Sequence, residues 1–281
     1  MQVLRKKFIF LQPNTPFVSS NRQNTSTDKT EKVMRQTLQT LFLSCMMMVN
    51  ALSVQASGVA NIASTASEDN SGVVARMDLP AFTGVYSDLV ASITIEKGDK
   101  YFVEAHGPEH LIQLIEPVVE KEGGTLSLKA KREYKTKKQG ITIRVVTPQL
   151  DLIYNEGVGD IRTKGNFKTQ MMTITNEGVG NITIADIECE RLQVLLEGVG
   201  KIIITGKATH AVFKSEGVGG INAYGLQVAN LNAELEGVGG IECNVTERFT
   251  CSSEGVGSIY YMGNPKQTNI KSNGIGKVVR K

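Results

Sequence analysis

The sequence Glu156-Gly157-Val158-Gly159 decides the fold, because this tetrapeptide returns at a nearly constant interval through the second half of the chain. Glu-Gly-Val-Gly starts again at Glu177, Glu197, Glu216, Glu236 and Glu254, and Asn273-Gly274-Ile275-Gly276 closes the series. The successive intervals are 21, 20, 19, 20, 18 and 19 residues. A period near 20 residues indicates stacked units, each too small to bury its own apolar face.

Apolar residues flank each repeat at odd distances from its first position, which is the alternation of a half-buried strand. Five residues after that position the seven repeats carry Ile161, Ile182, Ile202, Ile221, Ile241, Ile259 and Val278. Three residues before it they carry Ile153, Ile174, Val194, Phe213, Ala233, Cys251 and Ile270. Residues 151–281 are therefore predicted to form an all-β fold, a right-handed parallel β-helix of about seven rungs stacked about 4.8 Å apart.

Paired glycines mark the predicted corners, where a Cβ would forbid the backbone angles. They are Gly157, Gly159, Gly178, Gly180, Gly198, Gly200, Gly217, Gly219, Gly237, Gly239, Gly255, Gly257, Gly274 and Gly276. We expect the residue between each pair to point inward. In the ladder three residues before the repeat, bulky Phe213 is expected to lie between the smaller Val194 and Ala233, as close packing requires.

Residues 73–150 have a different pattern, read as a β-rich section that covers the first rung. The stretches 90–96 and 100–105 are predicted to form a hairpin around Lys97-Gly98-Asp99. Residues 111–119 form a short apolar piece broken by Pro117. Residues 125–130 and 140–146 give two more alternating strands, and Pro148 marks the passage into the first rung.

The start of the chain is typical of an export signal. Arg35 precedes the apolar residues 41–49, and the small residues of Val54-Gln55-Ala56 suit a signal peptidase. We interpret residues 1–33 as an over-extended start, 34–56 as the signal peptide and 57–72 as a flexible leader. Lipidation at Cys45 is the alternative to cleavage near Ala56. The protein is then exported, to the periplasm, the outer membrane or the medium, without a transmembrane span in the mature chain.

The charge balance argues against a nucleic-acid partner. The whole chain has 31 basic and 28 acidic side chains, but residues 1–56 hold seven of the basic and two of the acidic ones. The remainder carries 24 basic and 26 acidic residues, and binding to phosphate backbones needs clustered positive charge.

The repeat also aligns six carboxylates in one file, the candidate interaction ladder: Glu156, Glu177, Glu197, Glu216, Glu236 and Glu254. Charges about 5 Å apart repel by roughly 1 kcal/mol in bulk water and by more near a protein surface. Divalent cations such as calcium, a cationic partner or raised carboxylate pKa values would relieve this repulsion. A solvated file with splayed side chains is the simplest alternative.

Other chemistry-bearing residues carry weaker patterns. Residues 129–138 hold six cations and are expected at a hairpin tip, solvated or touching anionic groups. His106 and His110 have the spacing of a helical metal pair, but Gly107 and Pro108 interrupt a helix. Cys243 and Cys251 are expected as buried thiols, with a disulfide as the alternative. We assign no catalytic residue and no cofactor.

Together these features resemble a known family. The opening around Phe82, residues 85–95, the Gly123–Leu128 segment, residues 143–152 with Pro148, and the Gly-x-Gly rungs are similar to the exported "putative auto-transporter adhesin, head GIN domain" family over about residues 78–277. The resemblance implies adhesion and supplies no catalytic residues. The usual family corner, Ser-Gly-Ser-Gly, is replaced here by Glu-Gly-Val-Gly in six of seven corners.

Three functions follow as hypotheses. The first is an exported, non-catalytic binding module that presents a repetitive face to a glycan, an envelope component or a protein partner. The second is a carbohydrate-active enzyme, by analogy with other β-helices. The third is an envelope structural protein, because the last rung lacks an obvious cap and invites end-to-end self-association.

Overall fold

A computed structural model describes residues 73–121, 124–131 and 140–281. The predicted start, signal peptide, leader and Cys45 all lie outside these residues. The first seven strands and the one helix of the described chain are β1 (Val73–Asp78), β2 (Phe82–Ser87), β3 (Ala91–Lys97), β4 (Phe102–Gly107), α3 (Glu109–Ile112), β5 (Ile115–Val119), β6 (Gly124–Ala130) and β7 (Ile141–Thr147). The repeat region adds β8 (Leu152–Asn155), β9 (Ile161–Lys164), β10 (Phe167–Asn176), β11 (Ile182–Leu196), β12 (Val199–Ser215), β13 (Val218–Leu235), β14 (Val238–Ser253), β15 (Ile259–Met262), β16 (Gln267–Ser272) and β17 (Val278–Arg280).

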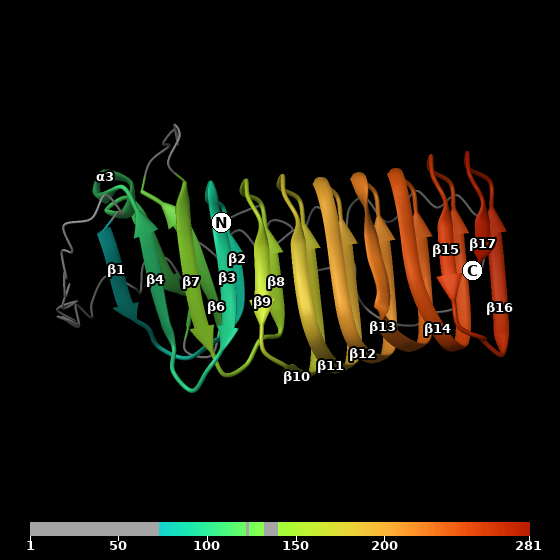
Figure 1. Ribbon diagram of the computed structural model, residues 1–281, viewed down its shortest axis with the longest axis horizontal. Helices are drawn as coiled ribbons and strands as arrows, with labels where there is room; N and C mark the ends of the chain where they lie inside the picture. The colour runs from blue at the N-terminus through green and yellow to red at the C-terminus, as the bar shows by residue number, and fades with distance from the viewer. Residues whose placement is uncertain (1–72, 122–123, 132–139) are drawn as a thin grey trace, which may run out of the picture. The chain divides into compact units, whose positions relative to one another are not determined.

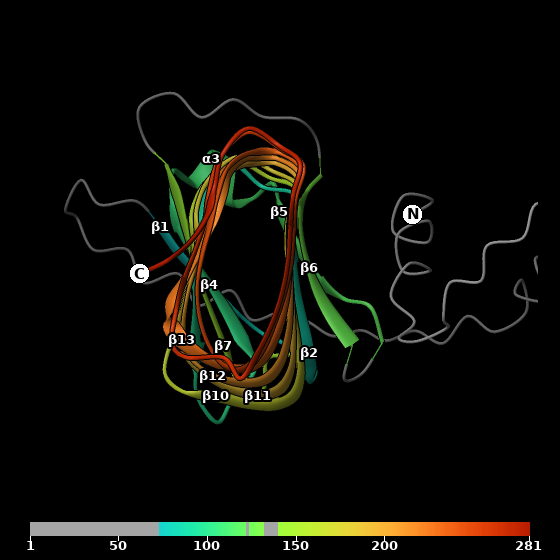
Figure 2. The same cartoon turned by 90° about the vertical axis from the view of Figure 1, so that its right-hand side faces the viewer.

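The repeat region is a β-solenoid, which confirms the predicted all-β helical stack. From β8 to β17, strands of successive turns pair in parallel (Figure 1), and a view along the stack superimposes the turns as one elongated ring (Figure 2). The solenoid has about six turns, fewer than the about seven rungs predicted. Counting corners caused the difference, because seven corners enclose six complete turns of chain.

Aliphatic ladders fill the interior of the stack. The residues five positions after the repeat start are at most 1% exposed from Ile161 to Ile259. Phe213 is fully buried and pairs with Val194 on one side and Ala233 on the other, as predicted. This alternation of large and small side chains lets neighbouring turns keep the strand spacing without a cavity.

The N-terminal strands do not stack in chain order. β7 lies between β3, with which it pairs in parallel, and β4, with which it pairs antiparallel. The predicted hairpin around Lys97-Gly98-Asp99 is therefore wrong, because β7, which follows β3 by 50 residues and β4 by about 40, separates its two arms. The prediction followed the rule that neighbouring strands pair, and long-range parallel pairing overrode it.

Two edges of the first layer are covered by antiparallel strands. β4 and then β1 cover the outer edge of β7, while β5 covers that of β6. Pro117 does not break its segment: it pairs with Leu128 inside β5. Proline is tolerated there because β5 is an edge strand, so its missing N–H costs no ladder bond. β6 pairs with β2 and β5, and β7 pairs with β3 and β4. Most of the basic residues 129–138, predicted to lie at a hairpin tip, are outside the described residues.

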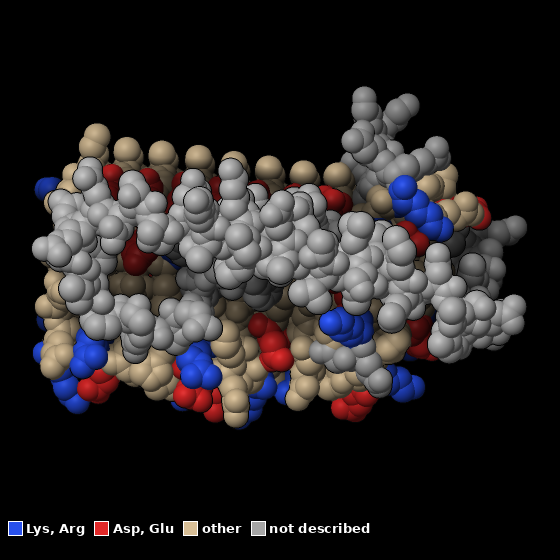
Figure 3. All heavy atoms as spheres, turned by 180° about the vertical axis from the view of Figure 1, so that it is seen from behind, with Lys and Arg blue, Asp and Glu red and all other residues tan. Residues whose placement is uncertain are grey.

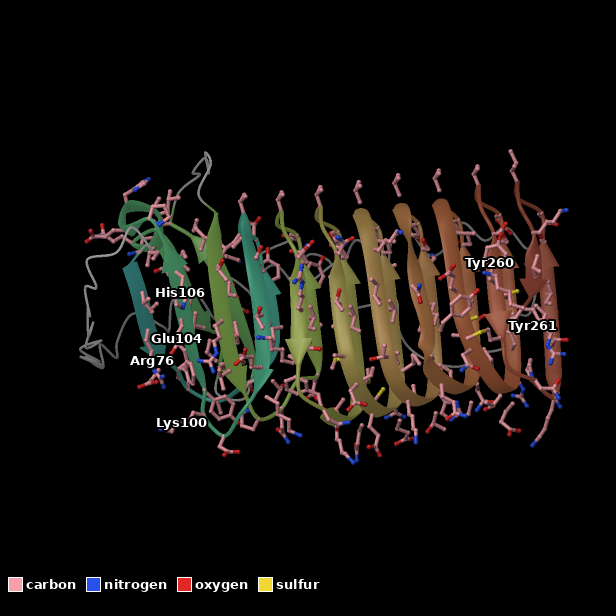
Figure 4. All side chains as sticks on the ribbon, in the orientation of Figure 1. Arg76, Lys100, Glu104, His106, Tyr260 and Tyr261 are labelled. Atoms are coloured by element: carbon pink, nitrogen blue, oxygen red, sulfur yellow. The ribbon has the colours of Figure 1, made fainter. Side chains whose placement is uncertain are left out.

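A row of alternating charges crosses these N-terminal strands (Figure 4). Arg76 and Arg144 both bind Glu104, at 3.1 and 2.8 Å. Arg144 also binds Glu96 at 2.7 Å, and Lys164 binds the same carboxylate at 3.1 Å. The row ties the covering strands β1 and β4 to β9 of the first Gly-cornered turn.

The last turn is the most exposed part of the described solenoid. All six residues of β16 are exposed, and within the described residues no strand pairs with the outer edges of β16 and β17. End-to-end self-association therefore stays a prediction. Among the described residues no helix is long and apolar enough to cross a membrane.

Candidate functional site: the corner strip

The stacked corners form one continuous surface, which we call the corner strip: the seven four-residue corners that start at the repeat positions. Backbone hydrogen bonds join successive corners, for example from Val179 N to Gly157 O at 3.0 Å and from Gly180 N to Val199 O at 2.9 Å. A Cβ on Gly178 would lie 2.0 Å from Gly157 O. Gly180 has a φ of +140°, which side chains rarely tolerate. The glycines are thus required by the corner of the preceding turn.

An eighth corner, which the repeat did not reveal, opens the strip at residues 88–91. Val90 forms a parallel bridge with Val158, and Val158 N binds Leu89 O at 2.9 Å. Its glycine positions are taken by Leu89 and Ala91. Its sequence therefore lacked the glycine pair on which the prediction relied.

The central residue of each corner points outward, so the prediction that it points inward is wrong. Eleven large apolar side chains are exposed among the described residues, and seven of them occupy this position. We call them the valine ridge: Val158, Val179, Val199, Val218, Val238 and Val256, each 46–53% exposed, and Ile275, 74% exposed. Each of these residues lies two positions after its repeat start, and the alternation of the flanking strands places residues at even distances from that start on the outer face.

Figure 3 shows the ridge as a row of uncharged side chains along the upper edge, with acidic side chains beneath it. Figure 4 shows the same row in profile, projecting beyond the ribbon at each corner. Parallel bridges and strand pairs run through it from Val90 to Ile275. A continuous file of exposed aliphatic side chains is the kind of patch that marks an interaction surface.

The glutamate file runs beside the ridge, and side chains that lie two residues before the start of a corner partly compensate its charge. Tyr86 donates a hydrogen bond to Glu156 at 2.5 Å, and Tyr154 donates one to Glu177. In both cases the phenol reaches the carboxylate of the next turn. Burial, together with the carboxylate it binds, raises the pKa of each tyrosine above its usual range. Both phenols therefore stay protonated and donate at neutral pH.

Further along the file, an ammonium group bridges two carboxylates. Lys214 Nζ lies 2.5 Å from Glu216 and 3.6 Å from Glu236. These partners were not among the predictions, although a polar residue two positions before the repeat start could have indicated them. A hydroxyl or ammonium supplied by the chain itself thus relieves repulsion at several steps, a compensation that none of the sequence-based alternatives included.

A groove lies between the glutamate file and the valine ridge over the last five corners. Its lining repeats glutamate on one wall, glycine on the floor and valine on the other wall, from Glu197 to Val256, and ends with Asn273, Gly274 and Ile275. The strip therefore carries a ridge and a groove that run side by side.

A second groove lies across strands β10 to β14, on another side of the stack from the corner strip. Cys189 and Ala208 form part of its floor, and Lys168 and Glu188 on its rim form a 2.7 Å ion pair. Thr169 donates a 2.5 Å hydrogen bond to Asp151 there. The corner strip is the stronger candidate, because it combines a groove with a file of exposed apolar side chains.

The remaining candidates do not assemble into a metal or redox site. Within the described residues, no group of three or more His, Cys, Asp or Glu side chains could hold a metal ion. His106 lies in β4 and His110 in α3, so they do not share a helix. Cys243 and Cys251 are buried free thiols, and burial raises their pKa values to about 12 and about 11.

The chain belongs to the family described as "Putative auto-transporter adhesin, head GIN domain", whose model matches residues 81–265. Among solved structures, a putative adhesin from Bacteroides fragilis NCTC 9343 is 30% identical, with a TM-score of 0.71 over 76% of this chain and 98% of that one.

Two more distant structures share the fold. One is a putative adhesin from Parabacteroides merdae ATCC 43184, 16% identical, with a TM-score of 0.55 over 73% of this chain and 95% of that one. The other is described as a putative lipid binding protein from Parabacteroides distasonis ATCC 8503, 20% identical, with a TM-score of 0.56 over 73% and 96%. No curated protein matches the chain. The family and the Bacteroides fragilis structure support an adhesin-like role.

Proposed function

We propose that this protein is an exported, non-catalytic adhesin-like module that binds its partner through the corner strip. The observation that carries the proposal is the valine ridge, seven aliphatic side chains that the solenoid holds about half exposed in one straight file. Burying them against a partner removes apolar surface from water, which is the main driving force of most protein association. The glutamate file beside them selects the charge of that partner.

The partner is a glycan, an envelope component or a protein. The groove supports an elongated ligand, because glutamate, glycine and valine line it in the same order at each of several corners. Export is supported by the signal-like residues 34–56 together with the adhesin family. Calcium is retained as a condition of the test, since carboxylates are the ligands that this cation prefers.

Binding of the purified protein to arrayed glycans and matrix proteins, with and without calcium, tests the proposal. We expect a specific signal that falls at least tenfold when Val199, Val218 and Val238 are changed together to Thr, which keeps the β-branched shape. Val212→Thr is the matched control, because Val212 is 37% exposed but lies outside the strip.

A parallel set changes Glu197, Glu216 and Glu236 together to Gln, with Glu190→Gln as the exposed control outside the file. Loss of signal in this set and not in its control assigns the glutamate file to the binding surface. A signal that survives both strip variants contradicts the proposal, and so does a protein that binds neither an arrayed surface nor a second copy of itself.

A further inference from the structure

We infer that the partner of the corner strip is a second copy of this chain, packed side by side with its solenoid axis parallel to the first. This inference rests on the proposed function, since it names the occupant of the same surface. Its starting point is that the strip is self-complementary. The valine ridge stands next to a groove with a glycine floor, and both are built from the same corners.

An interface between two identical copies related by a two-fold axis must present one patch that fits itself. The strip meets this requirement when the ridge of each copy lies in the groove of the other. The ridge residue of one copy then contacts the glycine floor, for example around Gly217 and Gly237, where no side chain obstructs it. The aliphatic side chains of both copies are covered in the same step.

The spacing of the strip restricts what can lie along it. Successive ridge residues belong to adjacent parallel strands, so they recur about every 4.8 Å. An extended peptide lying along the ridge presents side chains to one face only about every 6.7 Å, and it drifts out of register within a few corners. Another stack of β-strands has the same spacing, and a second copy has it over the full length of the strip.

The charges select one of the two symmetric arrangements. A two-fold axis perpendicular to the ridge places the glutamate file of one copy against the glutamate file of the other. An axis parallel to the ridge places the glutamate file of one copy against a different row of the other copy. That row lies on the far side of the ridge, four residues after each repeat start. That row consists of Asp160, Asn181, Lys201, Gly220, Gly240, Ser258 and Lys277. At equal heights Glu197 then faces the cation Lys201, and Glu156 faces the acid Asp160. The other four glutamates face amide, hydroxyl or glycine positions, so no file of carboxylates opposes another.

The size of the strip sets the expected strength. The five corners that line the groove span about 19 Å at the strand spacing. A narrow contact of this length belongs to the small, transient class of interface, below about 1,200 Å² in total. The last turn is a poorer contact between copies, because residues 259–281 carry five cations and no acidic side chain. Two such ends brought together would repel each other.

Sedimentation velocity over a wide concentration range tests the inference on the full-length chain carrying Cys45→Ser. We expect reversible dimers, and at least a tenfold weaker association when Val199, Val218 and Val238 are changed together to Thr. Val212→Thr is expected to leave the association unchanged. A monomer at every concentration overturns the inference, and so does a dimer that the triple variant does not weaken.

Variants with one added cysteine on the ridge then test the parallel arrangement with a short bismaleimide, since the native thiols Cys189, Cys243 and Cys251 are buried. Val179→Cys, Val218→Cys and Val256→Cys are each expected to cross-link to their own kind, because equal heights face each other. Val212→Cys is the control and is expected not to cross-link. In the antiparallel arrangement only the central Val218→Cys links to itself, while Val179→Cys links to Val256→Cys in mixtures. That pattern overturns the parallel assignment.

The same proteins separate this inference from the proposed function. Binding to an arrayed ligand without self-association leaves the adhesin-like role standing and overturns the second copy as the partner. Self-association without any arrayed ligand, lost in the triple variant, supports the second copy. It then assigns the adhesin-like contact to pairing between copies of the chain.

Discussion

The corner glycines give the sharpest test of how the strip is built. In Gly239→Ala, the new Cβ would lie 1.4 Å from Gly219 O, and the residue has a φ of +148°. The strained backbone costs about 1–3 kcal/mol, and the overlap with a backbone oxygen adds about 1–3 kcal/mol or more, because the preceding corner must move. We expect the free energy of unfolding to fall by about 2–6 kcal/mol, a large fraction of a typical total of about 5–15 kcal/mol.

Urea unfolding followed by far-ultraviolet circular dichroism measures this loss. Gly140→Ala is the matched control: its Cβ would meet nothing within 4 Å, and its φ is not positive. That change is expected to leave stability equal or to raise it by about 0.4–1 kcal/mol. Gly276→Ala meets Gly257 O at 1.8 Å but lies in the last turn, so it is expected to unfold only that turn. The reasoning is refuted if Gly239→Ala unfolds within about 1 kcal/mol of Gly140→Ala.

Two substitutions and one labelling experiment test the other contacts. Arg144→Met removes bonds to two carboxylates and should cost about 1–2 kcal/mol in urea unfolding. The hydrogen bond from Arg144 lowers the pKa of Glu96, so this contribution is present above the usual carboxyl pKa and lost as pH falls; the variant should therefore lose less stability on acidification, and an unchanged acid limb would contradict the assignment. Burial raises the pKa of Tyr154, so stability should decline as pH rises above its unfolded value near 10. Tyr154→Phe should reduce that alkaline decline, and an identical decline in both proteins would exclude this phenol as its cause. The thiol of Cys243, with a pKa of about 12, should resist a thiol reagent at pH 8 until urea unfolds the chain; rapid labelling of the folded protein would show that the interior is open.

The solenoid could be predicted because its information is local and repeated. Ladder residues at odd distances from the repeat start, such as Ile182 and Ile202, carry both the strand alternation and the period of the turn. The same alternation predicts that Val218, two residues after its repeat start, points outward. Its apolar character instead suggested an inward direction. The error shows that at a tight corner the backbone parity decides exposure, even against side-chain hydrophobicity.

The rest depends on contacts that no local pattern carries. The insertion of β7 between β3 and β4 joins segments about 40 residues apart. The row from Arg76 to Lys164 crosses strands from four separate parts of the sequence. The tyrosine that binds Glu177 lies one turn earlier in the chain. Each of these became visible only when the stacking order of the turns was known.

The corner sequence also separates what the fold needs from what the surface offers. Stacking requires the glycines, because the carbonyl of the preceding corner occupies the place of their Cβ. It does not require an apolar residue between them: these side chains are about half exposed, and Thr would keep the same β-branched shape in water. Yet all seven corners carry Val or Ile there, while the position two residues before the repeat start varies from Tyr154 through Leu195 and Lys214 to Ser252. A feature that packing does not demand, but that is kept at every turn, is best explained by a contact that uses the whole file at once.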